Sequence, residues 1–146
     1  MCLIIKRKKE KIAEDDIIVY KMLYVSPKGE IKSMVYSYSW KKNKLYTTEL
    51  KESDKEHPAA DSVEVANLNR LYGDSWYDNI FDLNLMVIGE GFHSCLTLER
   101  ALILSKSYAS NFGSNSIFQC IIPKGAKYYK NKTLIVSDKL IIKKRI

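Results

Sequence analysis

The chain has 146 residues, of which 46% are hydrophobic, and its formal net charge is +7. This length and apolar content suffice for one buried core, so we expect a single domain that needs neither disulfides nor metal. The three cysteines, Cys2, Cys95 and Cys120, include no CxxC pair, which excludes a zinc-binding pair and fits a reducing cytoplasm. The apolar run at residues 1–5 is too short for a signal peptide or a membrane span, so we expect a cytoplasmic protein without membrane contact.

Charge is distributed unevenly along the chain. Residues 51–100 contain ten acidic and four basic residues, whereas the remainder contains 20 basic and 7 acidic residues, a net charge of +13. A basic surface raises the local concentration and association rate of anionic partners, although salt screens it over roughly 8 to 10 Å. A solvated basic surface with no partner is the alternative interpretation, and both stay open.

Strand patterns dominate the first fifty residues. We expect a short strand at 2–6, a loop at the acidic run 14–16, and a longer strand in the β-branched and aromatic run 17–24. The Ser-Pro-Lys-Gly sequence at 26–29 predicts a hairpin turn. Its second arm, 33–40, alternates strictly, so its aromatic residues and Met34 should share one face. A further strand is expected at 45–48.

The second half of the chain predicts one principal helix between strands. Residues 50–82 are expected to be an inserted or decorating segment with a short helix at 62–71, and the apolar residues 83–88 predict a central strand. A bulge or bend at Gly89–Gly91 follows. Thr97 as N-cap, Glu99 in the first turn and helical spacing of apolar residues predict the principal helix at about 97–112.

The remaining residues return to strand patterns. Gly113 marks the end of the helix within 111–115, and strands are expected at 116–122, 126–129 and 133–144, with a turn at Pro123–Gly125. Together the elements predict an α+β fold, in which a mostly antiparallel, twisted sheet is covered by one principal helix. A doubly wound parallel sheet is disfavoured, because the chain offers too few helices for its crossovers.

The candidate binding residues gather mainly in the last third of the chain. A ligand with phosphates and flat rings requires basic groups, hydroxyl or backbone donors, and aromatic faces. Residues of these types occur at strand ends and turns, where they could meet such a ligand. The candidates are Tyr20, Lys21, His93, Ser94, Lys124, Lys127, Tyr128, Tyr129, Ser137 and Lys139.

The turn at 123–125 carries the main candidates for phosphate contact. Lys124 and Lys127 flank it, and Gly125 allows close backbone approach. The alternative is that the turn only shapes a hairpin and that its lysines keep the protein soluble. Tyr128 and Tyr129 point to opposite faces of a strand, so at most one of them can stack on a base.

His93 and Ser94 are adjacent strand residues and face opposite ways, so they cannot form a nucleophile–base pair. His93 suits a donor role toward a phosphate or a ribose hydroxyl, with a structural histidine as the alternative. By the same alternation, one of Tyr20 and Lys21 should face a ligand or partner and the other the core. Cys120 is expected to be buried and unreactive.

Four sequence blocks, in this order and spacing, carry a resemblance: DIIVYK at 16–21, GFHS at 91–94, CIIPKGAKYY at 120–129 and SDKLII at 137–142. They resemble a family of short, mostly uncharacterised proteins encoded by bacteriophages and by bacteria that carry prophages. Small phage proteins include inhibitors of host defence. By analogy with those that sequester cyclic-nucleotide signals, the resemblance implies a noncatalytic nucleotide-binding homo-oligomer, a sponge, in the host cytoplasm and without a cofactor.

Three other functions stay open. The basic ends and tyrosine-rich strands could hold single-stranded RNA or DNA by charge and stacking, with strong salt dependence. The acidic middle segment or the aromatic strand at 34–40 could inhibit a host protein by direct contact. An ADP-ribosyltransferase-like enzyme is least favoured, because neither Glu90 nor Glu99 has a supporting motif.

Overall fold

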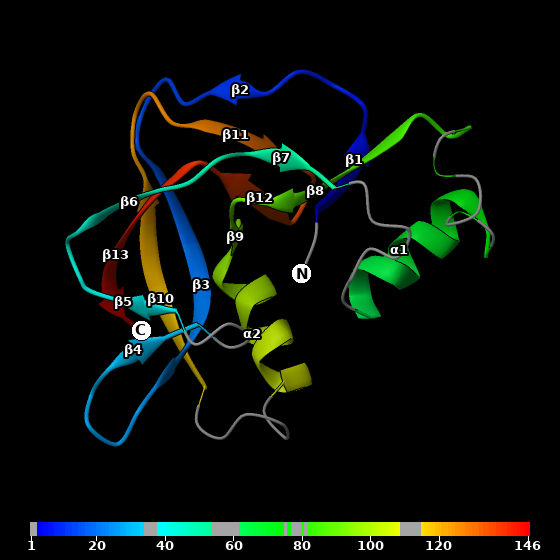
Figure 1. Ribbon diagram of the computed structural model, residues 1–146. Coiled ribbons are helices and arrows are strands. Elements are labelled where there is room, and N and C mark those ends of the chain that lie inside the picture. The colour runs from blue at the N-terminus through cyan, green and yellow to red at the C-terminus, as the bar shows by residue number, and fades with distance from the viewer. Residues whose placement is uncertain are drawn as a thin grey trace.

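The computed structural model describes residues 3–33, 38–53, 62–74, 76, 80, 82–108 and 115–146, with backbone only at 62–64, 107 and 108. These residues form a mostly antiparallel β structure with two helices, α1 (Ser62–Tyr72) and α2 (Leu98–Tyr108) (Figure 1). The strands are β1 (Leu3–Lys6), β2 (Lys11–Ile12), β3 (Ile17–Val25), β4 (Ile31–Lys32), β5 (Ser39–Trp40), β6 (Leu45–Thr47), β7 (Lys51–Glu52), β8 (Leu85–Glu90), β9 (Phe92–Cys95), β10 (Asn115–Ile122), β11 (Lys127–Lys130), β12 (Leu134–Ser137) and β13 (Lys139–Arg145).

The described strands form two sheets. The larger has the order β2-β11-β12-β9-β3-β10-β13-β6, with β4 and β5 branching from β3, and the smaller has the order β1-β8-β7. All pairings between these strands are antiparallel. The predicted α+β class and antiparallel character are therefore confirmed. Over the described residues, α2 agrees with the principal helix predicted at about 97–112, and α1 agrees with the short helix predicted at 62–71; each has 11 residues.

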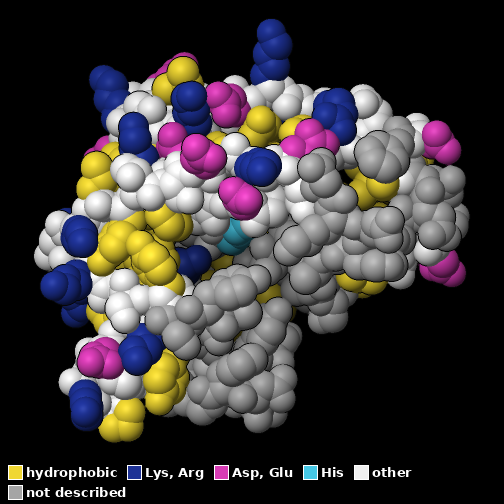
Figure 2. Space-filling view, viewed as in Figure 1, with side chains coloured by type: hydrophobic (Ala, Val, Ile, Leu, Met, Phe, Trp, Pro, Cys, Tyr) yellow, Lys and Arg dark blue, Asp and Glu magenta, His cyan; other side chains and the backbone are white. Residues whose placement is uncertain are grey.

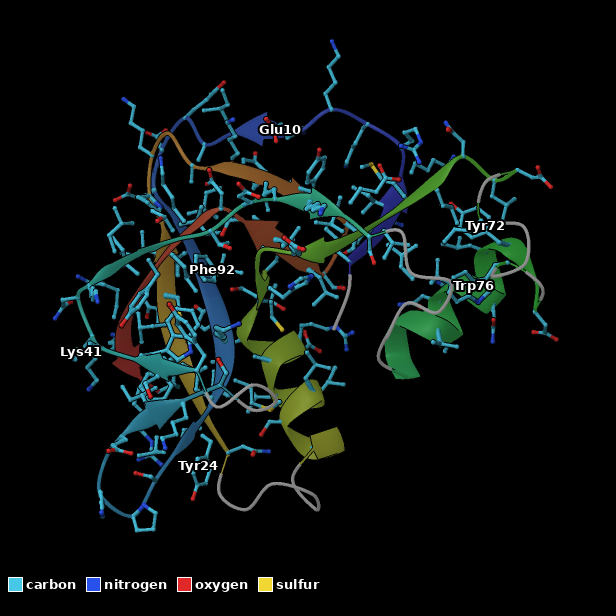
Figure 3. All side chains as sticks on the ribbon, in the orientation of Figure 1. Glu10, Tyr24, Lys41, Tyr72, Trp76 and Phe92 are labelled. Carbon is cyan, nitrogen blue, oxygen red and sulfur yellow. The ribbon has the colours of Figure 1, made fainter. Side chains whose placement is uncertain are left out.

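Both faces of the smaller sheet pack against apolar neighbours along β1 and β8. In β1 and β8 the apolar residues run without interruption, which is typical of strands buried on both sides. Alternate residues, such as Leu3 and Ile88, pack against the larger sheet and α2, while Ile4 and Val87 pack beneath α1. Tyr72 and Trp76 belong to the same apolar cluster as Ile4 and Val87, and Figure 3 shows them together beside α1.

The larger sheet wraps around a core of its own, which we call the inner core. Ile135 on β12 and Tyr46 on β6 come from distant strands of the sheet order, yet they pack in one buried cluster with Val19 and Leu23 of β3. Tyr20 instead packs into the core between the two sheets. Because strand residues alternate between faces, Lys21 lies in phase with Val19 and Leu23 and points toward the inner core.

Two predicted strands are wrong in extent. The second arm at 33–40 is not one strand of the hairpin with β3: β5 pairs antiparallel with β4, and the Ser33 N–H donates to the Tyr38 carbonyl. Residues 34–37, including Met34, lie outside the described residues. The predicted strand at 133–144 is divided into β12 and β13, because the Ser137 hydroxyl donates to the Lys139 carbonyl and closes a corner at Asp138.

Local turn and cap predictions are confirmed. Gly29 has a φ of 83° and donates its N–H to the Ser26 carbonyl, as a hairpin turn at 26–29 requires. The Arg100 N–H donates to Thr97 Oγ1 at 3.2 Å, which makes Thr97 the N-cap of α2. Residues 111–114 of the helix end predicted within 111–115 lie outside the described residues, as do Cys2 and His57. Neither described helix has the length and hydrophobicity needed to span a bilayer.

Candidate functional site

The most unusual polar group in the described structure is the Lys21 ammonium. Its Nζ donates to the His93 carbonyl oxygen at 2.7 Å and lies 5.8 Å from the centroid of the Trp40 ring. Burial among these neighbours lowers the pKa of Lys21 below its ordinary value of 10.5. No described carboxylate lies within ion-pair distance of it. The fold therefore holds a largely buried amino group whose charged form no described acidic group compensates.

Lys21 is nevertheless not fully buried, because part of the residue's surface remains exposed. Figure 2 shows a histidine side chain (cyan) largely covered on this face of the molecule, with acidic (magenta) and basic (dark blue) side chains near it.

The Trp40 ring lies next to the ammonium, and three further aromatic rings pack against Trp40. Trp40 packs edge-to-face against Tyr38, Tyr46 and Phe92, with ring centroids 4.9, 4.7 and 5.4 Å away. Figure 3 places Phe92 in the interior of the strand layer. Tyr38 is 47% exposed. We call these four residues the aromatic cluster; through Tyr38 it keeps one ring accessible to a flat ligand.

Hydrogen bonds fix the orientation of two of these rings. Trp40 Nε1 donates to Ser33 Oγ at 2.8 Å, and Tyr46 Oη accepts the Lys41 N–H at 2.7 Å. The polar atoms of both rings are therefore satisfied within the protein. Trp40 and Tyr46 therefore need no ligand to form these hydrogen bonds.

Ser94 adds an unsatisfied hydroxyl beside Lys21. Cys95 pairs with Tyr20 across β9 and β3, and both residues belong to the core between the sheets, so their neighbours Ser94 and Lys21 share the opposite face. Ser94 is 2% exposed, and its Oγ has no described hydrogen-bond partner. A buried hydroxyl left unpaired costs roughly 1 to 3 kcal/mol. Lys21 and Ser94 therefore present two donors that the described protein does not fully use.

Replacing Ser94 with alanine is expected to leave stability unchanged or raise it by up to about 1 kcal/mol, because the change removes an unpaired buried hydroxyl. Ser137→Ala is the matched control. That serine is also buried, at 0% exposure, but its Oγ donates to the Lys139 carbonyl at 2.9 Å. Its loss should cost about 1 kcal/mol. Urea unfolding of both variants measures the difference, and equal losses would show that Ser94 has a structural partner.

The His93 ring is held between two backbone carbonyls. Nδ1 lies 3.2 Å from the Gly91 oxygen and Nε2 lies 3.1 Å from the Ile88 oxygen. Burial, followed by the nearby Lys21 charge, lowers the pKa of His93 to about 4. The neutral ring carries one N–H and donates it to one of these two carbonyls, which supports the structural role considered for this histidine. Its contribution to the site is to orient β9, whose carbonyl accepts from Lys21.

The other predicted tyrosines are partly buried. Tyr128 packs against the inner core, whereas Tyr20 and Tyr129 pack into the core between the sheets. Tyr128 and Tyr129 therefore lie on opposite faces of β11, as alternation predicts. Ser137, opposite Tyr128 in the sheet, is fully buried, and Lys139 lies on β13 opposite Thr47.

The turn at 123–125 is surrounded by carboxylates. The Lys124 N–H donates to Asp16 Oδ1 and the Lys127 N–H to Asp138 Oδ1, each at 2.9 Å, while Lys127 Nζ lies 3.6 Å from Glu10 Oε1. A cavity of about 540 Å³ lies next to Tyr128, and it is lined by Lys11, Ile12, Glu14, Asp15, Asp16, Ile17 and Tyr128. Because carboxylates outnumber lysines in this lining, it is less suited to phosphate than the surroundings of Lys21.

The structure thus brings some of the predicted site residues together and leaves the others apart. Lys21, Ser94 and the His93 backbone come together where β3 and β9 meet. Lys127 lies on β11, two strands from β9 in the sheet order. Sequence reasoning missed Trp40 as a site residue, although its position in an aromatic alternation was a usable signal. Tyr46 and Phe92 gave no such signal, because only tertiary packing brings these segments together.

Other site chemistries find no support in the described residues. No group of three or more His, Cys, Asp or Glu side chains within them is arranged to hold a metal ion. Cys120 is fully buried, and burial raises the pKa of its thiol to about 12, so it is unreactive as expected. Comparison of the chain with protein-family models, with curated proteins and with solved structures found no match. The resemblance to phage proteins therefore stays a prediction, and function is argued from the site.

Proposed function

We propose that the protein binds a small anionic nucleotide without catalysis and so sequesters it, with Lys21, Ser94 and the aromatic cluster as the binding site. The observation that carries this proposal is the largely buried Lys21 ammonium with no described carboxylate partner. Charges inside proteins are normally paired, because an isolated buried charge is costly. A phosphate would supply the missing negative charge and accept hydrogen bonds from both Lys21 and Ser94.

The aromatic cluster favours a nucleotide over a simple inorganic anion. A nucleobase can stack on an aromatic face, and such stacking is worth about 1 to 3 kcal/mol per base. Tyr38 offers an exposed ring next to Trp40, and Trp40 adjoins Lys21. The proposed ligand class is a cyclic oligonucleotide signal of antibacteriophage defence, which combines phosphates and flat bases. The proposed assembly is a homo-oligomer, which analytical ultracentrifugation checks.

Isothermal titration with cyclic di- and trinucleotides, NAD-derived signals, inorganic phosphate and a short oligonucleotide tests the proposal. We expect a cyclic nucleotide to bind, and Lys21→Met to weaken binding by roughly a hundredfold, because a charge-assisted hydrogen bond is lost. Lys124→Met is the matched control, since it removes an exposed lysine from the other predicted site. Affinity should also fall as the pH rises above the lowered pKa of Lys21, because the neutral amine binds phosphate poorly.

Each contrary outcome has a distinct meaning. Equal loss of affinity in Lys21→Met and Lys124→Met would move the ligand to the 123–125 turn. Binding of the oligonucleotide alone would favour a single-stranded nucleic-acid protein, and a chemically altered ligand, recovered by chromatography, would reveal an enzyme. No binding by any of these compounds would reject the proposal. Lys21→Met must unfold at a similar urea concentration for the comparison to hold.

A further inference from the structure

An apolar row crosses the outer face of the larger sheet. The strand register places Ile18 opposite Ile121, Ile121 opposite Ile141, and Ile141 opposite Leu45, so four neighbouring strands each contribute one aliphatic residue. Paired residues of neighbouring strands share a face. We call these four residues the aliphatic ladder. Its strands β3, β10, β13 and β6 lie side by side at one end of the sheet order.

The aliphatic ladder is not covered by the described protein. Ile18 is 53% exposed and Leu45 is 50% exposed, while Ile121 and Ile141 between them are partly buried. The inner-core residues Val19 and Tyr46 are their sequence neighbours, so the ladder points to the opposite side of the sheet from Lys21. It is therefore separate from the proposed nucleotide site, and a test of one does not depend on the other.

Basic residues border the ladder on both sides along β13. Lys139 precedes Ile141 by two positions on the same face, and Lys144 pairs with Gln119 on the other side, next to the exposed Lys143. None of these three lysines lies within ion-pair distance of a described carboxylate. Asp16, two positions before Ile18, already accepts a hydrogen bond from the Lys124 backbone. The rim of the ladder is thus positively charged along β13, whereas the carboxylate of Asp16 lies near its Ile18 end.

The chemistry of this surface selects among three kinds of occupant. A second copy would bring the lysines of two rims together, and like charges facing each other oppose association. Nucleic acid would be attracted by the lysines, but aliphatic side chains offer no aromatic face on which bases stack. A protein segment with aliphatic residues flanked by Asp or Glu would satisfy both the apolar row and its basic rim.

We propose that the aliphatic ladder is a docking surface for an acidic protein segment, whose aliphatic side chains cover Ile18, Ile121, Ile141 and Leu45 while its carboxylates meet the lysines of β13. Because the ladder crosses four strands, the segment lies across them and contacts side chains on one face of the sheet. The apolar contacts provide affinity, and the charge pattern provides selection of the partner.

Selection from a displayed library of random peptides about 12 residues long, with the full-length protein as target, tests the docking surface. We expect enriched peptides to combine aliphatic residues with Asp or Glu. The double variant Ile18→Thr/Leu45→Thr should bind them at least roughly tenfold more weakly, because both exposed ends of the ladder lose apolar contacts. Threonine suits strands, so the fold is retained, and circular dichroism checks this.

Exposed leucines outside the ladder provide the matched control. Leu71 and Leu102 lie on the helices and are 61% and 47% exposed. Leu71→Gln/Leu102→Gln should leave peptide binding unchanged, whereas raising NaCl from about 50 to about 300 mM should weaken it by screening the lysines. Enrichment of basic peptides, equal binding by the ladder double variant, or no enrichment would overturn the proposal. Self-association or oligonucleotide binding that requires Ile18 and Leu45 would also overturn it.

Discussion

Replacing Gly91 with alanine is expected to destabilise the protein by about 3 kcal/mol, because the site combines an unfavourable backbone conformation with steric overlap. Gly91 joins β8 to β9 and has a φ of +136°. A Cβ built there would lie 2.5 Å from Val136 Cγ2 and 2.7 Å from Leu50 Cδ2. Val136 lies on β12, the strand that pairs with β9, and both Val136 and Leu50 pack in the core between the sheets. Relief of the overlap would therefore move β9 away from β12.

The Gly29→Ala variant separates the cost of the backbone conformation from the cost of the steric overlap. Gly29 also has a positive φ, of +83°, but no atom lies within 4 Å of its built Cβ. This variant should lose only about 1 kcal/mol, the cost of the backbone conformation alone. Urea unfolding of both proteins at neutral pH gives the comparison. Similar losses at the two positions would mean that β9 accommodates the methyl group and that the close approach at Gly91 is unimportant.

Loss of stability in mild acid is the second large effect that we expect, and it depends on His93. The pKa of His93 is about 4 in the folded protein, against an ordinary value of 6.5, because burial and then Lys21 disfavour the imidazolium. As the pH falls from 6.5 toward 4, the unfolded chain binds the proton first, so folding is progressively opposed. The integrated loss over this window is about 3 kcal/mol, and it ceases below pH 4, where both states are protonated.

His93→Gln isolates this contribution, because glutamine is polar, cannot be charged and can still donate to a backbone carbonyl. Wild type and variant should differ in the pH dependence of their unfolding free energy between pH 4 and 6.5 and run parallel above this range. Carboxylates that titrate in acid, such as Glu52, are common to both proteins and cancel in the comparison. Parallel curves throughout would show that His93 binds its proton equally well in the folded and unfolded states.

Part of the candidate site was predictable from sequence. Lys21, His93 and Ser94 were selected as polar residues in strands, and alternation placed Tyr20 and Lys21 on opposite faces of β3; that one of them meets a ligand stays a prediction. The stronger sequence signal was the lysine- and tyrosine-rich turn at 123–125, yet its backbone donors bind Asp16 and Asp138. Those carboxylates come from other segments of the chain, so the negative surroundings of the turn could not be inferred from the residues next to it.

The aromatic cluster shows the same dependence on tertiary structure. Trp40, Tyr46 and Phe92 belong to three separate strands and meet only because the larger sheet wraps around the inner core. Sequence alternation placed Tyr38 and Trp40 on one face, but it did not reveal that β5 pairs antiparallel with β4. Strand periodicity is the same for an uninterrupted strand and for two short strands that pair with each other.

The sequence by itself determined the local elements: the long strand at Ile17–Val25, the turn at 26–29, the N-cap at Thr97 and an α+β composition. These depend on residues that are close in the chain, through side-chain alternation, turn dihedrals and capping hydrogen bonds. Only the tertiary structure decided the two sheets, the three cores, the position of Lys21 beside Ser94 and the aliphatic ladder. All of these depend on strand register between distant segments, and a shift of one residue would turn every side chain of a strand to its other face.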